Sequence, residues 1–356
     1  MAKYAAWAST IQGDAKLTAM KSVHLVIPGL FLPKDIAAEV HAGLSLPALE
    51  KILGRGHSEV LEPVALEELL YGLFDMRSAG DAPIAPVSAA FDGLSAGCWL
   101  RADPVHLRLQ RDQMLMLPVT EIRSDEAGQM CASLNEYFAG QGMEFLAPHP
   151  QRWYVRLDSL PDIRTRPISQ VIGADVRRAL PTGEDAPCWH RILNEIQMLL
   201  FAHPLNESRD ARGTLTINSV WLWGAGHSEN VSLQKNFNNV SSDEALVEMF
   251  ASSAGVPFTA WAGQWRDTES NGGQLLVWTG LRSALQSGDL GAWRSALQEF
   301  EKGYAQPLWQ ALRSGKIDRL QLDVPCVDSV RRVSLTRGDC WAFWRRARRL
   351  AEYSIV

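Results

Sequence analysis

The last third of the chain alternates between helix-like and strand-like stretches, and this alternation is what most constrains the fold. Helical patterns occupy Ser242–Ser252 and Gly291–Ser314, and short apolar runs lie at Pro257–Trp261, Gln274–Thr279 and Arg319–Val324. Strands that alternate with helices form βα units, whose strands run parallel to one another. We therefore predict an α/β core with a mostly parallel sheet flanked by helices.

The first third of the chain fits the same core. Val23–Pro33 has the apolar run of a first core strand, and Pro47–Leu53 and Ala65–Phe74 have helical periodicity. Arg77–Ala96 is rich in Gly, Ala, Pro, Ser and Asp, which predicts a linker. Met20 directly precedes the first strand, so we expect residues 1–19 to be a tail or a misassigned start.

The middle of the chain has the pattern of a separate α+β domain. Strand-like runs at Cys98–Leu100, Met114–Leu117 and Arg152–Leu157 surround a helical pattern at Ser124–Phe138. The turn-rich stretch Ala179–His190 then leads back towards the core. We expect residues 20–92 and 186–356 to form the core and residues 93–185 to form an inserted α+β domain.

Composition narrows the class of protein. The 356 residues are 46% hydrophobic and 21% charged, with a formal net charge of −5, so nucleic-acid binding is not expected. The five cysteines are widely spaced and form no Cys-x-x-Cys pair, which favours free thiols in a reducing compartment. No apolar run approaches the length of a membrane span, and we expect a cytoplasmic protein.

One stretch has the pattern of a strand that ends in a ligand-binding turn. It reads HPLNESRDARGTLTINSVWLWGAG from His203 to Gly226, with a strand predicted over Thr216–Trp223. We expect the glycines that follow, Gly224 and Gly226, to form a turn at which backbone amides approach a bound group.

This stretch resembles a block of the archaeal-type cofactor-independent phosphoglycerate mutases, members of the alkaline phosphatase superfamily. That block has a His-Pro-x-Asn-x-x-x-Arg stretch, then an Asn, an apolar run and Arg-Gly-x-Gly. The matching residues here are His203, Pro204, Asn206, Arg209 and Asn218, whereas Trp223 stands where the family has Arg.

Other segments resemble the family in the same order along the chain. They are Val23–Pro33, Leu46–Gly56, Tyr71–Asp75, Trp99–Leu107 and Ser124–Met130, and the resemblance as a whole extends from about Val23 to Leu322. The resemblance implies an alkaline-phosphatase-like core with an inserted domain, and we expect a divergent bacterial relative.

The family's chemistry needs two divalent metal ions and a Ser or Thr nucleophile. The pair that matches its first Asp-Gly ligand is Pro28-Gly29, and no histidine follows His227, so the family's C-terminal metal ligands are missing. Ser58 is the single candidate nucleophile. The resemblance therefore implies a pseudoenzyme without metal or cofactor, which serves as a binding or regulatory protein.

The alternative is an active phosphoglycerate mutase or related phosphotransferase whose ligands are displaced in sequence. It requires at least four side chains from a defined set to converge. That set is Asp35, His57, Asp103, His106, His203, Asp289, Asp323 and Asp328.

Polar groups that suit a small phosphorylated or carboxylated ligand remain in the sequence. We take the ligand-binding candidates to be Arg101, Asp103, His106, Arg111, His203, Asn206, Arg209, Asn218, Gly224 and Gly226. The alternative interpretation is that Arg101 pairs with Asp103 and that His203 caps the helix that precedes it.

Two further features have a structural and a functional interpretation. The thirteen tryptophans indicate core packing or, alternatively, a carbohydrate or partner surface. Trp341–Leu350 has the pattern of a basic amphipathic helix, which is either a solvated helix end or a docking site for an acidic protein partner, a nucleic acid or a membrane surface.

Overall fold

The computed structural model describes residues 20–74, 82–172, 174–267 and 271–354. These residues divide into two compact units. Unit 1 contains the described residues up to Phe74 and those from Gln234 onwards, and unit 2 contains those between Asp75 and Leu233.

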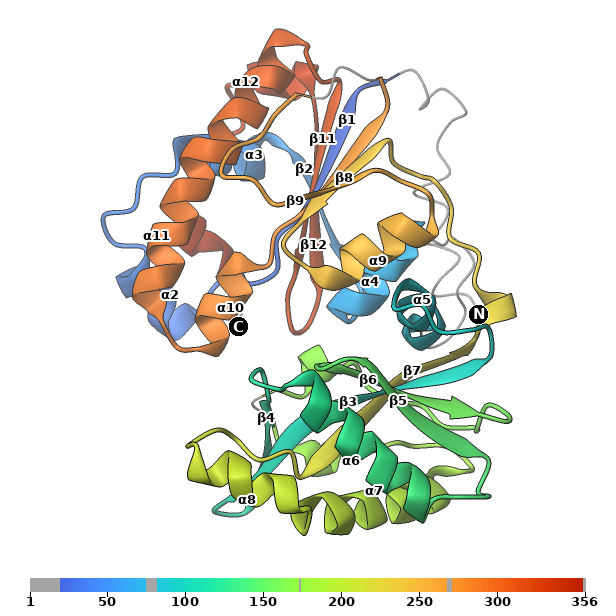
Figure 1. Cartoon of the computed structure of the whole chain (residues 1–356). Coiled ribbons are helices and arrows are strands. Elements are labelled where there is room, and N and C mark those ends of the chain that lie inside the picture. The colour runs from blue at the N-terminus through green and yellow to red at the C-terminus, as the bar shows by residue number, and fades with distance from the viewer. Residues whose placement is uncertain (1–19, 75–81, 173, 268–270, 355–356) are drawn as a thin grey trace. The chain divides into compact units, whose positions relative to one another are not determined.

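Unit 1 is built on a seven-stranded sheet with the strand order β2-β12-β11-β1-β10-β8-β9 (Figure 1). The five strands from β11 to β9 are parallel, and β12 and β2 are antiparallel at one edge. The strands are β1 (Ser22–Val26), β2 (His57–Leu61), β8 (Asn239–Ser242), β9 (Phe258–Ala260), β10 (Gly273–Val277), β11 (Arg319–Pro325) and β12 (Val330–Thr336). The predicted mostly parallel sheet in a mixed α/β fold is confirmed.

Helices cover both faces of this sheet (Figure 1). One side has α4 and α9, and the other has α3 and α10 to α12. The helices are α2 (Lys34–Val40), α3 (Pro47–Arg55), α4 (Leu66–Phe74), α9 (Ala245–Ser253), α10 (Gly280–Gln286), α11 (Leu290–Phe300) and α12 (Gln306–Ser314).

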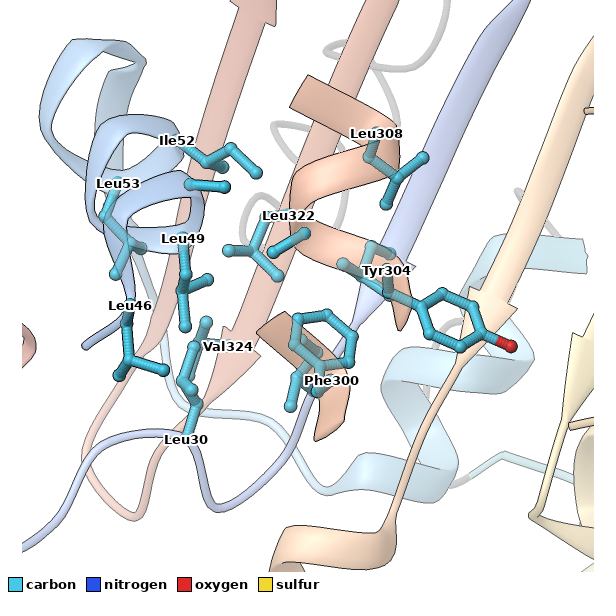
Figure 2. Packing of buried hydrophobic residues seen from close by; sticks show 14 of the residues in the cluster. Leu30, Leu46, Leu49, Ile52, Leu53, Phe300, Tyr304, Leu308, Leu322 and Val324 are labelled. Carbon is cyan, nitrogen blue, oxygen red and sulfur yellow. The ribbon is translucent and has the colours of Figure 1, made fainter. Parts of the chain in front are cut away.

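The α3 face of unit 1 packs a large apolar core. Leu49 and Ile52 of α3 point towards Leu322 of β11, and Phe300 and Leu308 approach from the other side (Figure 2). A π-helical turn, η5 (Glu301–Ala305), joins α11 to α12.

The π-helical turn also caps α3. The buried carboxylate of Glu301 accepts hydrogen bonds from the backbone N–H groups of Ala48 (2.8 Å) and Leu49 (3.0 Å). These donors have no partner inside α3, so Glu301 supplies the cap that Leu46 cannot provide.

Unit 2 is built on a five-stranded antiparallel sheet in the order β4-β3-β6-β5, with β7 paired to β3. Helices α6 and α7 pack on one face of this sheet, and α5 packs on the other. The elements are α5 (Ile84–Phe91), β3 (Cys98–Gln110), β4 (Gln113–Pro118), α6 (Ser124–Tyr137), β5 (Met143–His149), β6 (Arg152–Leu157), α7 (Ala186–Phe201), α8 (Pro204–Ala211) and β7 (Ser219–His227).

The boundaries of unit 2 differ from the expected insert of residues 93–185. Strand β7 pairs with β3 from Ser219 to His227, and α7 contributes Ile192 and Ile196 to the core of unit 2, so both elements belong to it. Helix α5 lies within the stretch predicted to be a linker; the earlier part of that stretch, residues 77–81, falls outside the described residues.

Two local predictions are wrong. The basic helix expected over Trp341–Leu350 does not form: the 3-10 turn η6 (Arg337–Trp341) ends where that helix should begin, and the next turn, η7 (Leu350–Tyr353), begins where it should end. The strand exit expected at Gly224 does not occur either, because β7 continues through Gly226 to His227.

Among the residues that the structure describes, no helix combines the length and the apolar character needed to span a bilayer.

Candidate functional site

The His203–Asn218 block folds into a short helix and a link, both tied to the sheet of unit 2. The Nδ1 atom of His203 accepts a hydrogen bond from the Leu205 N–H at the start of α8, and its Nε2 lies 3.1 Å from the Ser133 hydroxyl of α6. Burial lowers the pKa of His203. His203 is therefore the N-cap of the helix that follows it, whereas the sequence suggested a cap for the preceding one.

The two asparagines of the block hold backbone groups. Asn206 is buried and bonds the backbone of Leu200 and Ile217, with distances between 2.6 and 2.9 Å. Asn218 exchanges two hydrogen bonds with the N–H (2.7 Å) and C=O (2.9 Å) of Leu107 on β3. An amide side chain both donates and accepts hydrogen bonds, so it can pair with backbone N–H and C=O groups as a neighbouring strand would. Asn206 and Asn218 both do this.

Arg209 has no exposed surface, and all its bonds are internal. Its guanidinium donates to Glu126 Oε2 (2.6 Å) and to the backbone oxygens of Glu121 (2.7 Å) and Leu215 (2.9 Å). Burial opposes the ionisation of Glu126, yet the backbone N–H of Arg123 and the guanidinium groups of Arg212 and Arg209 hold the pKa of Glu126 below its ordinary value. Arg209 and Glu126 form a buried salt bridge that links α8 to α6.

Arg101 and Asp103 form a second buried network on β3, as the structural interpretation of the sequence predicted. Arg101 donates from Nε (3.0 Å) and Nη2 (2.5 Å) to Asp103 Oδ1, and from Nη1 to the Ser88 hydroxyl of α5 (3.2 Å). The indole N–H of Trp223 donates to Asp103 Oδ2 (2.7 Å). The Arg101 guanidinium also lies 5.2 Å from the ring centre of Tyr154, in cation–π geometry.

The remaining ligand-binding candidates of unit 2 lie apart from these networks. His106 Nδ1 contacts the carbonyl and hydroxyl oxygens of Thr216, both at 3.0 Å. Arg111 is exposed in the β3–β4 turn, where its φ is 54°. Arg101 and Asp103 are thus hydrogen-bonded to each other, whereas neither His106 nor Arg111 takes part in their network.

Gly224 and Gly226 serve helix packing. A Cβ on Gly226 would lie 2.5 Å from the Pro83 Cβ, and one on Gly224 would lie 3.0 Å from the Ile84 Cβ. Gly224 also has a φ of +67°, which L residues adopt with strain. What approaches these glycines closely is therefore the start of α5, where the sequence predicted a bound ligand.

Ser58, the candidate nucleophile, lies on the exposed edge strand β2 of unit 1. Its hydroxyl is 3.5 Å from Arg331 Nη1. Strand β2 is antiparallel to its neighbour, so Ser58 is outside the parallel strands whose carboxyl ends form ligand sites in α/β folds.

Strands β1, β11 and β12 of the unit 1 sheet are joined by a buried ionic network. Asp323 on β11 is fully buried, and it accepts from Arg332 Nε (2.8 Å) and Nη2 (2.7 Å) on β12. His24 Nε2 on β1 lies 2.9 Å from Asp323 Oδ2 and 3.1 Å from Gln321 Nε2. Burial opposes the charge on Asp323, but His24 and Arg332 lower its pKa to about 2.

Sequence reasoning missed this network, although a signal was present. His24 and Asp323 lie between apolar residues of β1 and β11, and Arg332 directly precedes Val333 of β12; these apolar neighbours face the α3 core. Period-2 alternation thus places the three polar residues on one face of the sheet. Their pairing also needs the strand order β12-β11-β1, which the sequence does not reveal.

Two further acidic residues, Asp243 and Glu244, follow the carboxyl end of β8. Asp243 Oδ1 accepts from the Thr279 N–H (2.7 Å), and Glu244 accepts from the Leu246 N–H (3.4 Å) at the start of α9. Burial raises the pKa of both carboxyl groups. Within the four described ranges, no group of three or more His, Cys, Asp or Glu side chains gathers in a geometry that could hold a metal ion.

The residues at or near the positions that match the family's metal ligands are hydrogen-bonded to other groups or have no side-chain ligand atom. Asp323 is bonded to Arg332 and His24, and Pro28 carries no ligand atom. Asp289 caps α11 through the Ala292 N–H (2.8 Å), and Asp328 is an exposed residue that accepts from the Ser329 hydroxyl (3.1 Å).

Comparisons with known proteins give partial matches. No protein-family model matches the chain. Over 193 residues it is 24% identical to a 2,3-bisphosphoglycerate-independent phosphoglycerate mutase from Methanosarcina mazei. The aligned region covers 51% of this chain and 48% of that protein. Over 109 residues it is 29% identical to the protein of the same name from Methanothrix thermoacetophila, covering 30% and 26% of the two chains.

The fold itself matches over nearly the whole chain. The PH0037 protein from Pyrococcus horikoshii superposes with a TM-score of 0.55 at 13% identity, covering 94% of this chain and 93% of that one. A cofactor-independent phosphoglycerate mutase from Thermoplasma acidophilum gives a TM-score of 0.48 at 14% identity. The matched segments span about half, or less, of the curated relatives, and they relate this chain to phosphoglycerate-mutase-like proteins.

Proposed function

We propose that this chain is a phosphoglycerate-mutase-like protein that acts by binding or regulation and not through a two-metal centre. The observation that carries the proposal is the bonding of Asp323. Its register partner is Val26, the last residue of β1, so its carboxylate lies near the carboxyl end of the central parallel strands. This is the end at which α/β folds bind ligands.

The Asp323 carboxylate already has a cation. Arg332 binds both of its oxygens, and a guanidinium keeps its charge at any physiological pH. A metal ion that took the same oxygens would displace Arg332, which is itself buried, and would leave its charge without a partner. The residues that match the family's motif are likewise hydrogen-bonded to other groups of unit 2; they are Asn206, Arg209 and Asn218.

Metal content and turnover, measured on the same sample, test the proposal. Protein purified without chelator is offered manganese, zinc or magnesium, its bound metal is measured by elemental mass spectrometry, and mutase turnover is followed with 3-phosphoglycerate. We expect neither stoichiometric metal nor turnover.

The variant Asp323→Asn separates the two functions. If Asp323 only pairs with Arg332, the variant loses stability and its metal content is unchanged. Two bound metals with turnover in the natural protein, both lost in Asp323→Asn, would establish the alternative of an active mutase with displaced ligands.

A small phosphorylated or carboxylated ligand belongs to the same proposal. Isothermal titration calorimetry with 3-phosphoglycerate measures the binding of such a ligand directly, and we expect saturable binding without conversion to product. A titration without heat or saturation would remove this ligand from the proposal and leave binding to a protein partner.

A further inference from the structure

The C-terminal part of unit 1 exposes large aromatic side chains beside arginines. Phe343 is 70% exposed, Trp344 79% and Trp341 47%. Arg345, Arg346 and Arg348 follow directly and are also exposed. We call these six residues the C-terminal aromatic–arginine surface. Aromatic residues exposed together, next to polar ones, typically mark interaction sites.

The backbone beneath this surface is fastened to α3. Arg55 Nη1 donates to the Cys340 oxygen (2.5 Å), and Arg345 Nη1 donates to the Arg55 oxygen (2.8 Å). A Cβ on Gly54 would lie 2.7 Å from the Ala347 Cα, so the segment crosses α3 at van der Waals distance. The segment is thus held in place although it is not a helix.

Two of the aromatic rings are fixed by cation–π contacts. The Arg55 guanidinium lies 5.9 Å from the Phe343 ring centre and 5.4 Å from that of Trp309, and Arg313 lies 5.1 Å from the Trp341 ring. A surface whose side chains are already ordered loses less conformational entropy when a partner binds. Arg346 and Arg348 extend this ordered surface with positive charge.

The charge of this region is opposite to that of the chain. Residues 337–349 contain five arginines and one aspartate, a net charge of +4, whereas the whole chain has a net charge of −5. The rest of the chain has a net charge of −9 (−5 minus +4), so the overall charge of the protein disfavours an extended polyanion such as a nucleic acid or an anionic membrane. Charge interactions between exposed groups decay over about 8 Å at physiological salt, so a short acidic segment would meet only the arginines.

We propose that the C-terminal aromatic–arginine surface binds an acidic segment of a protein partner that also carries an apolar side chain. Tryptophan and arginine are the residues that dominate binding energy at protein interfaces. Arg346 and Arg348 would pair with carboxylates, and Trp344 would cover the apolar side chain. The inference goes beyond the proposed function and does not depend on it, because mutase turnover and metal content do not involve this surface.

The probe is a fluorescein-labelled peptide in which Asp and Glu alternate with single Trp and Leu residues. Its binding to the full chain is followed by fluorescence anisotropy. We expect saturable binding that weakens as salt is added, about tenfold weaker binding by Arg346→Glu/Arg348→Glu, and about fivefold weaker binding by Trp344→Ala.

The matched control is Arg164→Glu/Arg178→Glu, which makes the same charge change at exposed positions of unit 2. We expect it to bind the peptide within about twofold of the natural chain, because these positions lie outside the patch. Circular dichroism and thermal unfolding verify that every variant is folded.

Three results would overturn the proposal. The first is no saturable binding by the natural chain, and the second is an equal loss in the control pair. The third is tighter binding of a single-stranded oligonucleotide or a phosphatidylserine vesicle that depends on Arg346 and Arg348, which would assign the surface to a polyanion.

Discussion

Removing the cation of the Asp323–Arg332 pair should destabilise unit 1. The variant Arg332→Met keeps a long side chain and deletes the two N–H groups that bond the fully buried carboxylate. Leaving a buried charge without its partner costs about 3–5 kcal/mol. We expect a loss of that size in the free energy of unfolding, measured with urea at neutral pH by circular dichroism.

The pKa of Asp323 gives an independent value for the stability that its ionic contacts contribute. It is lowered from 3.8 to about 2, and a shift of this size corresponds to about 2.5 kcal/mol. Because the folded-state pKa is the lower one, this stability is fully present above the ordinary pKa and is lost as the pH falls from about 4 towards 2. Arg332→Met should therefore also flatten the pH dependence of unfolding in this range.

A double-mutant cycle separates the pair from general packing. Asp323→Leu alone leaves the Arg332 charge buried, whereas Asp323→Leu/Arg332→Met removes both charges. The double variant should lose less stability than the sum of the single variants, by at least about 2 kcal/mol. The control is the ion pair of the exposed Arg191 with the partly exposed Glu195, 3.9 Å apart, and Arg191→Met should change stability by less than about 0.5 kcal/mol. Additive losses at Asp323 and Arg332 would refute the reasoning.

Three further predictions concern other parts of the chain. Glu126→Gln leaves the buried Arg209 without a counter-charge and should lower the free energy of unfolding by about 3 kcal/mol in a urea titration. Gly226→Ala forces a Cβ against Pro83 and should lower the thermal unfolding midpoint, with a loss of about 1–3 kcal/mol. Cys188 is the exposed cysteine, so Cys188→Ser should remove the fast phase of labelling by a thiol reagent.

The glycine and cysteine predictions each have a matched comparison. Gly128 lies inside α6 with nothing within 4 Å of an added Cβ, so Gly128→Ala should stabilise by about 0.5–1 kcal/mol. Burial raises the pKa of Cys131 to about 12, so Cys131→Ser should leave the fast labelling phase intact. Equal effects of the two glycine variants, or of the two cysteine variants, would contradict the packing described for these sites.

The sequence predicted the fold where periodicity is strong. Helices α3 and α4 begin and end close to the predicted positions, and the single predicted stretch Gly291–Ser314 is occupied by α11, the turn η5 and α12; each helix has a broad buried apolar face. Strand β2 was missed because its residues are exposed at a sheet edge and show no alternation of buried positions. The C-terminal segment has helical periodicity, but its bonds to α3 hold it in another conformation.

The candidate site was less predictable than the fold. Residue types at Arg101 and Asp103 suit a ligand and an internal ion pair equally well, and only the strand neighbours decide between the two. The same is true of Gly224, whose freedom could serve a bound group or a packed helix. A sequence shows which chemistry a side chain offers, whereas the partner it meets depends on contacts between segments far apart in the chain.

The order of motifs along this chain therefore carries information about architecture more than about chemistry. Asn206, Arg209 and Asn218 link α7, α8 and the start of β7 to β3 and α6 through hydrogen bonds that hold these elements in place. Such residues can persist while the catalytic groups of a family change, because a buried arginine that loses its partner costs as much stability as a large core truncation. Resemblance in these positions thus supports a common fold. The bonding of Asp323 to Arg332 bears on the function, because it concerns the end of the sheet where ligands bind.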